Sequence, residues 1–225
     1  NNKIEVGFQL RAHPNLVKLH EVLKQKPFGP LYTYRAAVGY RLDRWRPDTN
    51  YRECYSASEK NGGGVLLDLI HEIDLVHWLT GGIQKIYGNI SHVSDLEISA
   101  EDLANLTLTN KNGAIGQIQM DMVSPEYRRS LELIYRDAIV YWDYTTGTVY
   151  KKQNGVMSLI DQTPKTFEKN VMFKKLMSNF IERINGEVRK PFCSFEEAIV
   201  VQKIAESARR SSMLNKVVNL DEFEI

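Results

Sequence analysis

Residues 62–79 read Gly-Gly-Gly-Val-Leu-Leu-Asp-Leu-Ile-His-Glu-Ile-Asp-Leu-Val-His-Trp-Leu, and this stretch decides how the rest of the chain must fold. From Val65 to Thr80 apolar residues occur nearly all round the circumference of a helix, and Gly81-Gly82 ends it. A helix without a wide polar face is buried on most sides. The sequence therefore predicts a buried helix over 65–80 that other elements cover.

Polar side chains on this helix need an explanation. Steps of three residues keep Asp68, His71 and Asp74 on one neighbouring row of a continuous helix. In such a row a carboxylate orients the imidazole of His71, and the imidazole serves as a general base near neutral pH. The alternative is a core histidine satisfied by hydrogen bonds, with Asp68 capping the start of the helix.

The spacing of possible metal ligands argues against a metal site. His71 and His77 are six residues apart and point about 120° away from each other on a helix. Cys54 and Cys193 lack the paired spacing of zinc ligands and are too few for a disulfide framework. We expect no metal and a reducing, cytoplasmic environment.

The chain after this helix predicts a sheet followed by two helices. Six short alternating runs, separated by turn signals, are typical of antiparallel strands. They are Lys85–Val93, Asp102–Thr109, Ala114–Met122, Arg129–Tyr135, Ala138–Tyr144 and Val149–Lys152. Helices are expected over Asn170–Asn185 and Ser194–Met213, the second opened by a capping-box pattern of Ser194 and Glu197.

The chain before the buried helix contains further elements. Alternation predicts strands over Lys3–Leu10 and Leu31–Tyr40, and helical spacing predicts a helix over Pro14–Lys26. Arg41–Lys60 has no clean period and is expected to be a long surface loop. Together these elements predict an α+β fold, with an open, mostly antiparallel sheet and helices packed on one of its faces.

The loop carries a second set of candidate site residues. Trp45, Tyr51 and Arg52 combine aromatic rings with a planar donor, which suits a sugar, a carboxylate or a phosphate. The alternative is a solvated loop whose aromatic side chains pack on the sheet. Arg11, just before Pro14, either joins this ligand site or only shapes the turn into the helix.

Composition and missing motifs exclude several classes of function. Twenty-nine basic against 28 acidic residues leave a formal charge of +1, which favours neither nucleic acid nor an anionic membrane. No apolar run approaches the roughly 18 residues of a membrane span. No G-x-G-x-x-G pattern occurs, so the sequence offers no phosphate cradle for a dinucleotide.

Several segments, in order, resemble one family, the Gfo/Idh/MocA oxidoreductases. The resemblance is to their C-terminal domain, which follows an N-terminal Rossmann domain in members of the family. The matching segments are Val6–Pro14, Gly29-Pro30-Leu31, the loop with Trp45-Arg46-Pro47, Tyr51-Arg52 and Tyr55-Ser56-Ala57, the glycine-led helix 62–82, and Ser194–Val218.

The resemblance implies a function and roles for particular residues. It identifies 1–225 as one substrate-binding and oligomerisation domain with a dihydrodipicolinate-reductase-like fold, and the dinucleotide-binding domain as missing from the sequence. His71 is then the proton donor or acceptor, assisted by Asp68, with Arg11, Trp45, Tyr51 and Arg52 on the substrate side. NAD or NADP is held mainly by the missing domain, and no residue here is assigned to it. The substrate is a sugar, a cyclitol or a nucleotide sugar.

Two features depart from the family pattern. The E-K-P motif is absent, since Glu59-Lys60 is followed by Asn61, and the acid lies three rather than four residues before His71, with Leu67 in the other place. We therefore expect the chain alone to be inactive. The resemblance also implies a homodimer or homotetramer that forms through the sheet. The rival hypothesis is a binding or dimerisation module that has lost its cofactor domain.

Overall fold

The structure is a computed structural model that describes residues 4–187 and 190–222. Nine strands form one sheet. They are β1 (Leu31–Gly39), β2 (Ile83–Ser91), β3 (Leu103–Asn110), β4 (Ile115–Asp121), β5 (Arg128–Tyr135), β6 (Ile139–Asp143), β7 (Thr148–Gln153), β8 (Val156–Gln162) and β9 (Val218–Asn219). The helices are α1 (Pro14–Lys24), α2 (Val65–Asp68), α3 (His71–Thr80), α4 (Asn170–Ile184) and α5 (Phe195–Leu214).

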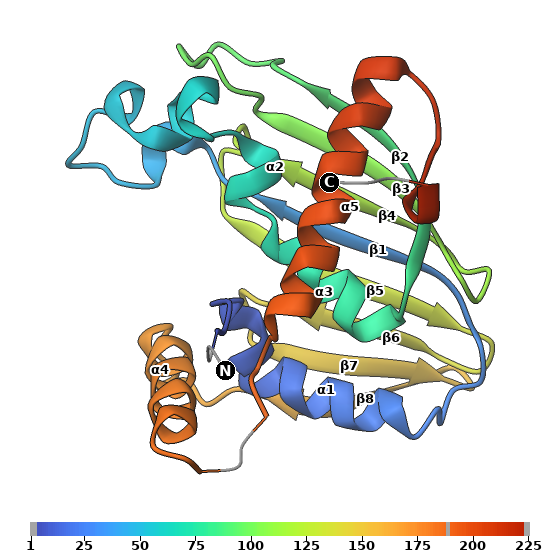
Figure 1. Cartoon of the computed structure of the whole chain (residues 1–225). Coiled ribbons are helices and arrows are strands. Elements are labelled where there is room, and N and C mark those ends of the chain that lie inside the picture. The colour runs from blue at the N-terminus through green and yellow to red at the C-terminus, as the bar shows by residue number, and fades with distance from the viewer. Residues whose placement is uncertain (1–3, 188–189, 223–225) are drawn as a thin grey trace.

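The sheet has the order β8-β7-β6-β5-β1-β4-β3-β2-β9. Among the described residues, β1 and β4 are the one parallel pair, and every other neighbouring pair is antiparallel. Helices α1, α3 and α5 lie against the same face of this open sheet (Figure 1). The predicted α+β fold, with helices on one face, is confirmed.

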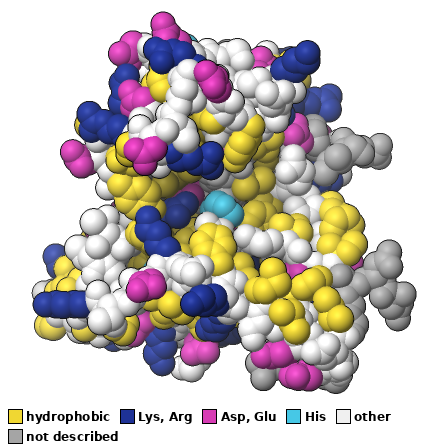
Figure 2. Space-filling model, turned by 90° about the vertical axis from the view of Figure 1, so that its left-hand side faces the viewer, with side chains coloured by type: hydrophobic (Ala, Val, Ile, Leu, Met, Phe, Trp, Pro, Cys, Tyr) yellow, Lys and Arg dark blue, Asp and Glu magenta, His cyan; other side chains and the backbone are white. Residues whose placement is uncertain are grey.

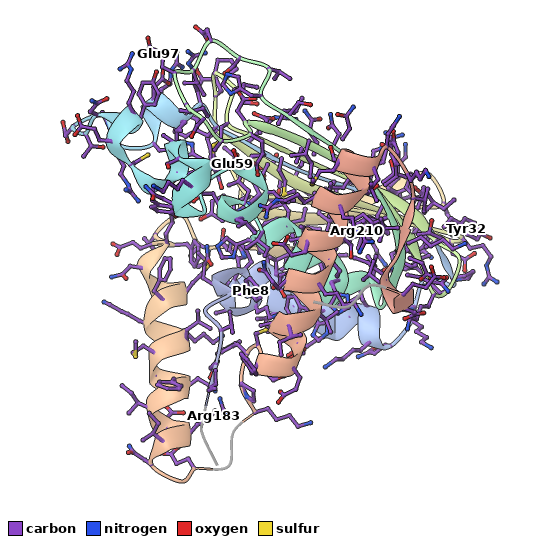
Figure 3. All side chains as sticks on the ribbon, turned by 45° about the horizontal axis from the view of Figure 1, so that its top comes forward. Phe8, Tyr32, Glu59, Glu97, Arg183 and Arg210 are labelled. Carbon is purple, nitrogen blue, oxygen red and sulfur yellow. The ribbon has the colours of Figure 1, made fainter. Side chains whose placement is uncertain are left out.

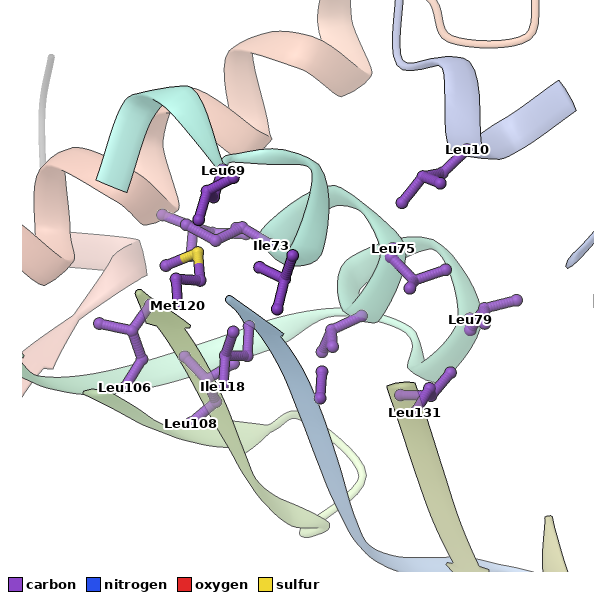
Figure 4. Packing of buried hydrophobic residues seen from close by; sticks show 14 of the residues in the cluster. Leu10, Leu69, Ile73, Leu75, Leu79, Leu106, Leu108, Ile118, Met120 and Leu131 are labelled. Carbon is purple, nitrogen blue, oxygen red and sulfur yellow. The ribbon is translucent and has the colours of Figure 1, made fainter. Parts of the chain in front are cut away.

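The core lies between that face and the helices. Figure 4 shows Ile73, Leu75 and Leu79 of α3 packed above strand residues. Their partners in the sheet include Leu106, Leu108, Ile118, Met120 and Leu131, all of which are at most 2% exposed. Its apolar circumference predicts that α3 is buried. The sheet covers α3 on one side and α5 covers it on another.

The predicted helix over 65–80 is broken. α2 ends at Asp68, Leu69 leaves helical geometry with φ −108° and ψ 21°, and α3 starts at His71. The break lets Leu69 pack into the core while the chain changes direction. It also means that side chains on the two sides of Leu69 do not share one helical row.

The glycines that lead into α2 are required by close packing. A Cβ at Gly63 would overlap the carbonyl oxygen of Tyr55. Gly64 has φ +117°, and a Cβ there would lie 2.5 Å from the carboxylate of Glu101. Glycine tolerates this conformation, which other residues rarely adopt. The run of glycines thus allows the 41–60 loop to lie directly against the start of α2.

Two further sequence predictions need correction. The strand predicted over Lys3–Leu10 does not join the sheet: Lys3 lies outside the described residues, Val6 N–H donates to the Cys193 carbonyl, and Gln9–Ala12 forms a 3-10 helix. Phe8 and Leu10 are buried, so the alternation reflects one-sided burial without a strand partner. β8, over Val156–Gln162, was not predicted as a strand.

Candidate active site

His71 lies at the first position of α3, where the chain re-enters helical geometry after the break at Leu69. Its half-buried ring packs edge-on against Phe8, with ring centroids 5.7 Å apart and an interplanar angle of 88°. In the part of the chain that the structure describes, its Nδ1 is buried and has no hydrogen-bond partner. Burial, together with the positive charge of Arg129, lowers the pKa of His71 to about 4. The imidazole is therefore neutral near pH 7 and able to accept a proton.

Asp68 does not orient His71 as the helical row predicts. Its Oδ1 accepts a hydrogen bond from Ser56 Oγ at 3.2 Å, and Tyr55 also contributes a side-chain hydrogen bond. Oδ2 is buried and has no partner among the described residues, and burial raises the pKa of this carboxyl. The expected Asp68–His71 hydrogen bond is absent between these two described residues because the chain breaks between α2 and α3. Asp68 instead connects the 41–60 loop to α2.

Asp74 and Arg11 belong to a buried ion-pair network. Arg11 is 2% exposed, and its Nη2 donates to Asp74 Oδ1 at 2.7 Å. Its Nη1 donates to Glu197 Oε1 at 2.8 Å and to the Phe192 carbonyl at 2.9 Å. These contacts join the segment before α1 to α3 and α5. The guanidinium of Arg11 thus lies in the core and is bound by partners within the chain, and a substrate contact by Arg11 stays a prediction.

A second buried pair lies directly beside His71. Arg129 of β5 donates from Nε and Nη2 to the two carboxylate oxygens of Glu72, at 2.6 and 2.9 Å. Glu72 is 1% and Arg129 9% exposed. Bidentate pairing of this kind fixes both side chains, and Arg129 supplies the charge that acts on His71.

The sequence indicates this pair by an arginine at a core-facing position of a strand and an acid on a buried helix. Arg129 shares its face of β5 with the buried Leu131 and Leu133, and its neighbour across β1 is Val38. An arginine at a core-facing strand position demands a buried acid as partner. Glu72, on a helix that is apolar nearly all round, is such an acid.

Among the described residues, no contact is found between His71 and the predicted loop residues Trp45, Tyr51 and Arg52. Trp45 Nε1 donates to the Tyr40 carbonyl at 2.8 Å, and the guanidinium of Arg52 stacks 4.7 Å from the Tyr51 ring centroid while pairing with Glu97. In Figure 3 Glu97 lies at an outer tip of the molecule, whereas Phe8, the ring neighbour of His71, lies near its middle. The structure brings Ser56 and Tyr55 of the loop, rather than Trp45, Tyr51 and Arg52, into contact with Asp68.

The face that carries α4 and the 41–60 loop is hollowed. Figure 2 shows a histidine side chain exposed at the floor of this hollow, with hydrophobic and basic side chains around it. The ring centroid of Tyr144 lies 5.9 Å from the guanidinium carbon of Arg129. Tyr144 also lines a cavity of about 500 Å³. A surface of this shape can accommodate a polar small molecule.

The described residues form neither a metal site nor a membrane-spanning helix. Within residues 4–187 and 190–222 no group of three or more His, Cys, Asp or Glu side chains could hold a metal ion. None of the helices described is long and apolar enough to cross a bilayer. Cys54 and Cys193 are free thiols.

Comparisons with known proteins identify relatives of the fold. A family model described as the GFO/IDH/MocA C-terminal domain matches residues 16–140. None of the curated proteins matches the sequence.

Solved structures match over almost the whole chain. A putative oxidoreductase from Thermotoga maritima is 19% identical, with a TM-score of 0.78 over 96% of this chain and 63% of its own. Levoglucosan dehydrogenase in complex with NADH is 16% identical, with a TM-score of 0.79 over 96% and 65%. A super-repressor mutant of Gal80p from Saccharomyces cerevisiae is 12% identical, with a TM-score of 0.82 over 98% and 66%. This chain thus spans 63–66% of the length of these structures.

Proposed function

Because this chain belongs to the Gfo/Idh/MocA family of oxidoreductases, we propose that it is the substrate-binding and proton-transfer part of an NAD(P)-dependent dehydrogenase. The family is shown by the model of its C-terminal domain, which matches residues 16–140. The proposed substrate carries a hydroxyl or keto carbon on a sugar, a cyclitol or a nucleotide sugar. Support comes from the solved structures of similar fold, among them a dehydrogenase of the sugar derivative levoglucosan bound to NADH.

The observation that carries the proposal is the neutral, half-buried imidazole of His71. During oxidation this imidazole accepts the proton of the substrate hydroxyl, and during reduction it returns the proton to the carbonyl oxygen. The chemistry expected of the nicotinamide is hydride transfer. Phe8 packs edge-on against the imidazole, and burial, together with the positive charge of Arg129, lowers the pKa of the ring so that it is unprotonated before substrate binds.

Asp68, three residues before His71 and not bonded to it, is proposed to act on the substrate side. Its Oδ2 is buried without a partner among the described residues, and its raised pKa favours a carboxyl that can carry a proton. Ser56 and Tyr55 hold this carboxyl in place. Trp45, Tyr51 and Arg52 remain proposed substrate contacts only for a ligand long enough to reach the outer part of the loop.

The nicotinamide cofactor needs a site that these residues do not form. No described residue belongs to a glycine-rich strand-to-helix turn of the kind that holds a pyrophosphate. We therefore propose that a separate dinucleotide-binding domain holds NAD or NADP. The apolar face of α4 supports its docking: Phe173, Met177 and Ile181 are 52%, 59% and 49% exposed.

The chain near residue 5 lies against the same helix. A cavity of about 470 Å³ is lined by Glu5 and Gly7 together with Phe173, Leu176, Met177 and Phe180. In Figure 1 α4 stands apart from the sheet, beside the start of the chain. An exposed apolar patch of this kind is typical of a surface that another domain covers.

We also propose a homo-oligomer formed through the open face of the sheet, and a cytoplasmic location consistent with the two free thiols. On that face Arg35, Thr107 and Gln117 are exposed, and Ile115 is 53% exposed. A broad face that combines apolar and polar side chains is suited to isologous pairing.

Turnover over a panel of sugars separates the enzyme from a non-catalytic module. The chain is produced both alone and joined behind a dinucleotide-binding domain, and reduction of NAD and NADP is followed by absorbance. We expect substrate-dependent turnover only when the two parts are joined. A joined protein that binds the cofactor but turns over no sugar, cyclitol or nucleotide sugar would favour the module.

A further inference from the structure

A polar cavity lies on the β6–β7 side of the candidate active site. We name it the lysine–tyrosine pocket and define it by the residues that line it. These are Tyr127, Tyr144, Thr145, Thr146, Gly147, Gln162, Thr163, Pro164, Lys165, Phe167 and Lys169. Its volume of about 500 Å³ falls in the range of small-molecule sites.

The lining of this pocket is positively charged. Lys165 and Lys169 contribute two ammonium groups, and none of the described residues that line it is acidic. Lys169 Nζ lies 5.4 Å from the ring centroid of Tyr127 and 5.9 Å from that of Tyr144, so cation–π contact holds it at the pocket wall. Within the described ranges neither lysine forms an ion pair.

Glu168, the acidic residue directly before Lys169, does not line the pocket, and two other carboxylates, at the end of β6 and on β8, already have partners. Asp143 Oδ1 accepts from the backbone N–H groups of Thr145 and Thr146, at 2.7 and 3.0 Å. Asp161 Oδ2 accepts from Asn15 Nδ2 at 2.9 Å. These carboxylates therefore stabilise the turn and the sheet edge, and the lysine charges remain available to a ligand.

A chain of contacts connects the pocket to His71. Tyr144 packs against the guanidinium of Arg129, Arg129 binds Glu72, and Glu72 is the residue after His71. The same guanidinium acts with burial to lower the pKa of His71, so Tyr144 of the pocket and the imidazole are both neighbours of Arg129. Arg129 itself is used by Glu72, which leaves the lysines as the cations for a ligand.

We propose that the lysine–tyrosine pocket binds an anionic group of the substrate, a carboxylate or a phosphate, while the hydroxyl-bearing carbon of that substrate faces His71. This inference rests on the proposed function and narrows its substrate class from sugars in general to acidic sugars. The tyrosine and threonine hydroxyls of the pocket supply hydrogen bonds to the neighbouring sugar hydroxyls.

Binding to the chain itself tests this without turnover. Glucuronate, glucose 6-phosphate and glucose are titrated separately into the ¹⁵N-labelled chain, and amide shifts are followed at Thr145–Gly147 and Thr163–Lys169. We expect the acidic sugars to bind with shifts at these positions, glucose to bind at least about tenfold more weakly, and Lys169→Gln to weaken the acidic sugars by about tenfold. The affinity ratio of glucuronate to glucose 6-phosphate distinguishes a carboxylate from a phosphate site.

Lys152→Gln is the matched control. It removes the same charge from an exposed lysine of the neighbouring strand β7 that does not line the pocket, and it should leave binding unchanged. Equal binding of glucose and the acidic sugars, or equal weakening by Lys152→Gln and Lys169→Gln, would overturn the inference. Either outcome leaves the proposed function standing, because turnover of neutral sugars that depends on His71 is a separate measurement.

Discussion

His71 owes its neutral state to two neighbours that come from distant parts of the chain. Phe8 covers the ring from the N-terminal segment, and Arg129 reaches it from β5. Burial and a nearby positive charge both disfavour the imidazolium. A base must be unprotonated before it can accept a proton, and His71 meets this condition.

Removing the charge of Arg129 should raise the pKa of His71. The double variant Glu72→Gln, Arg129→Met deletes both members of the pair, so neither is left buried alone, a situation that typically costs about 3–5 kcal/mol. We expect the pKa, measured by NMR at the His71 Cε1–H, to rise above about 4 and to stay below the ordinary 6.5, because burial persists. Arg35→Met, at an exposed position of the neighbouring strand β1, is the control. An unchanged pKa in the double variant would contradict the assigned role of Arg129.

The same histidine makes stability depend on pH. His71 and His13 both have pKa values lowered to about 4, chiefly by burial, whereas the unfolded chain titrates near 6.5. Between these values the unfolded state binds more protons, so the free energy of unfolding falls as the pH drops from about 6.5 to about 4. Each histidine contributes a slope of up to about 1.4 kcal/mol per pH unit. In urea unfolding, His71→Asn should show a flatter pH dependence than the unsubstituted chain, and parallel curves would rule this out.

At the scale of the elements, the break between α2 and α3 determines what the site contains. A continuous helix would place Asp68 and His71 on one row, but the non-helical Leu69 separates them. Asp68 then contacts Ser56, and Asp74 contacts Arg11. The glycines before α2 make this arrangement possible because they admit the loop and Glu101 at close range.

Gly64→Ala should destabilise the chain and loosen the start of α2. The added methyl meets the Glu101 carboxylate at 2.5 Å, and φ +117° is strained for alanine. We expect a loss of about 1–3 kcal/mol in the free energy of unfolding, measured by urea titration. Gly7→Ala is the matched control, because a Cβ there has nothing within 4 Å and its φ is not in the strained range. Equal effects of the two substitutions would contradict this explanation.

The sequence predicted most of the helices and strands, but fewer of the side-chain contacts between them. Alternation placed β1–β7 correctly to within a few residues, and the capping box of Ser194 and Glu197 is present at the start of α5. Periodicity could not reveal the break at Leu69, because an apolar residue there fits both a helix and a core-packed turn. It could not distinguish Lys3–Leu10 from a strand either, since one-sided burial produces the same alternation.

The contacts of the site were harder to predict, for a physical reason. His71 was identified from its place on a buried helix, but its partners Phe8 and Arg129 are separated from it by long stretches of chain. The sequence pattern of Arg11 resembled that of a ligand-binding cation. Only the fold shows that its guanidinium forms ion pairs with Asp74 and Glu197. Single-sequence patterns report which side of an element is buried, and they do not report what lies opposite.

At the scale of the whole molecule, the two faces of the sheet have different roles. One face packs under α1, α3 and α5 and brings β5 beneath the start of α3 (Figure 1). The other is proposed to pair with a second copy of the chain. α4 stands to the side with apolar residues outward, where a cofactor-holding domain is proposed to dock.

A charge on the open face should weaken the proposed oligomer. In Ile115→Asp the carboxylate lies on β4 near the middle of the sheet, where pairing of two copies would bury it without a partner. We expect a shift towards monomer in sedimentation velocity. Val156→Asp, at the exposed start of the edge strand β8, makes the same chemical change and should not alter the mass. A chain that is already monomeric without substitution would refute assembly through this face.

Proton transfer by His71 is the central claim, and turnover of the His71→Asn variant tests it most directly. The variant is placed in the chain joined to a dinucleotide-binding domain. His20→Asn is the control, because His20 lies on α1, where its ring stacks on Trp78. We predict that His71→Asn lowers kcat by about a hundredfold or more while cofactor binding is retained, and that His20→Asn leaves kcat near its original value. An unchanged kcat in His71→Asn would contradict the account.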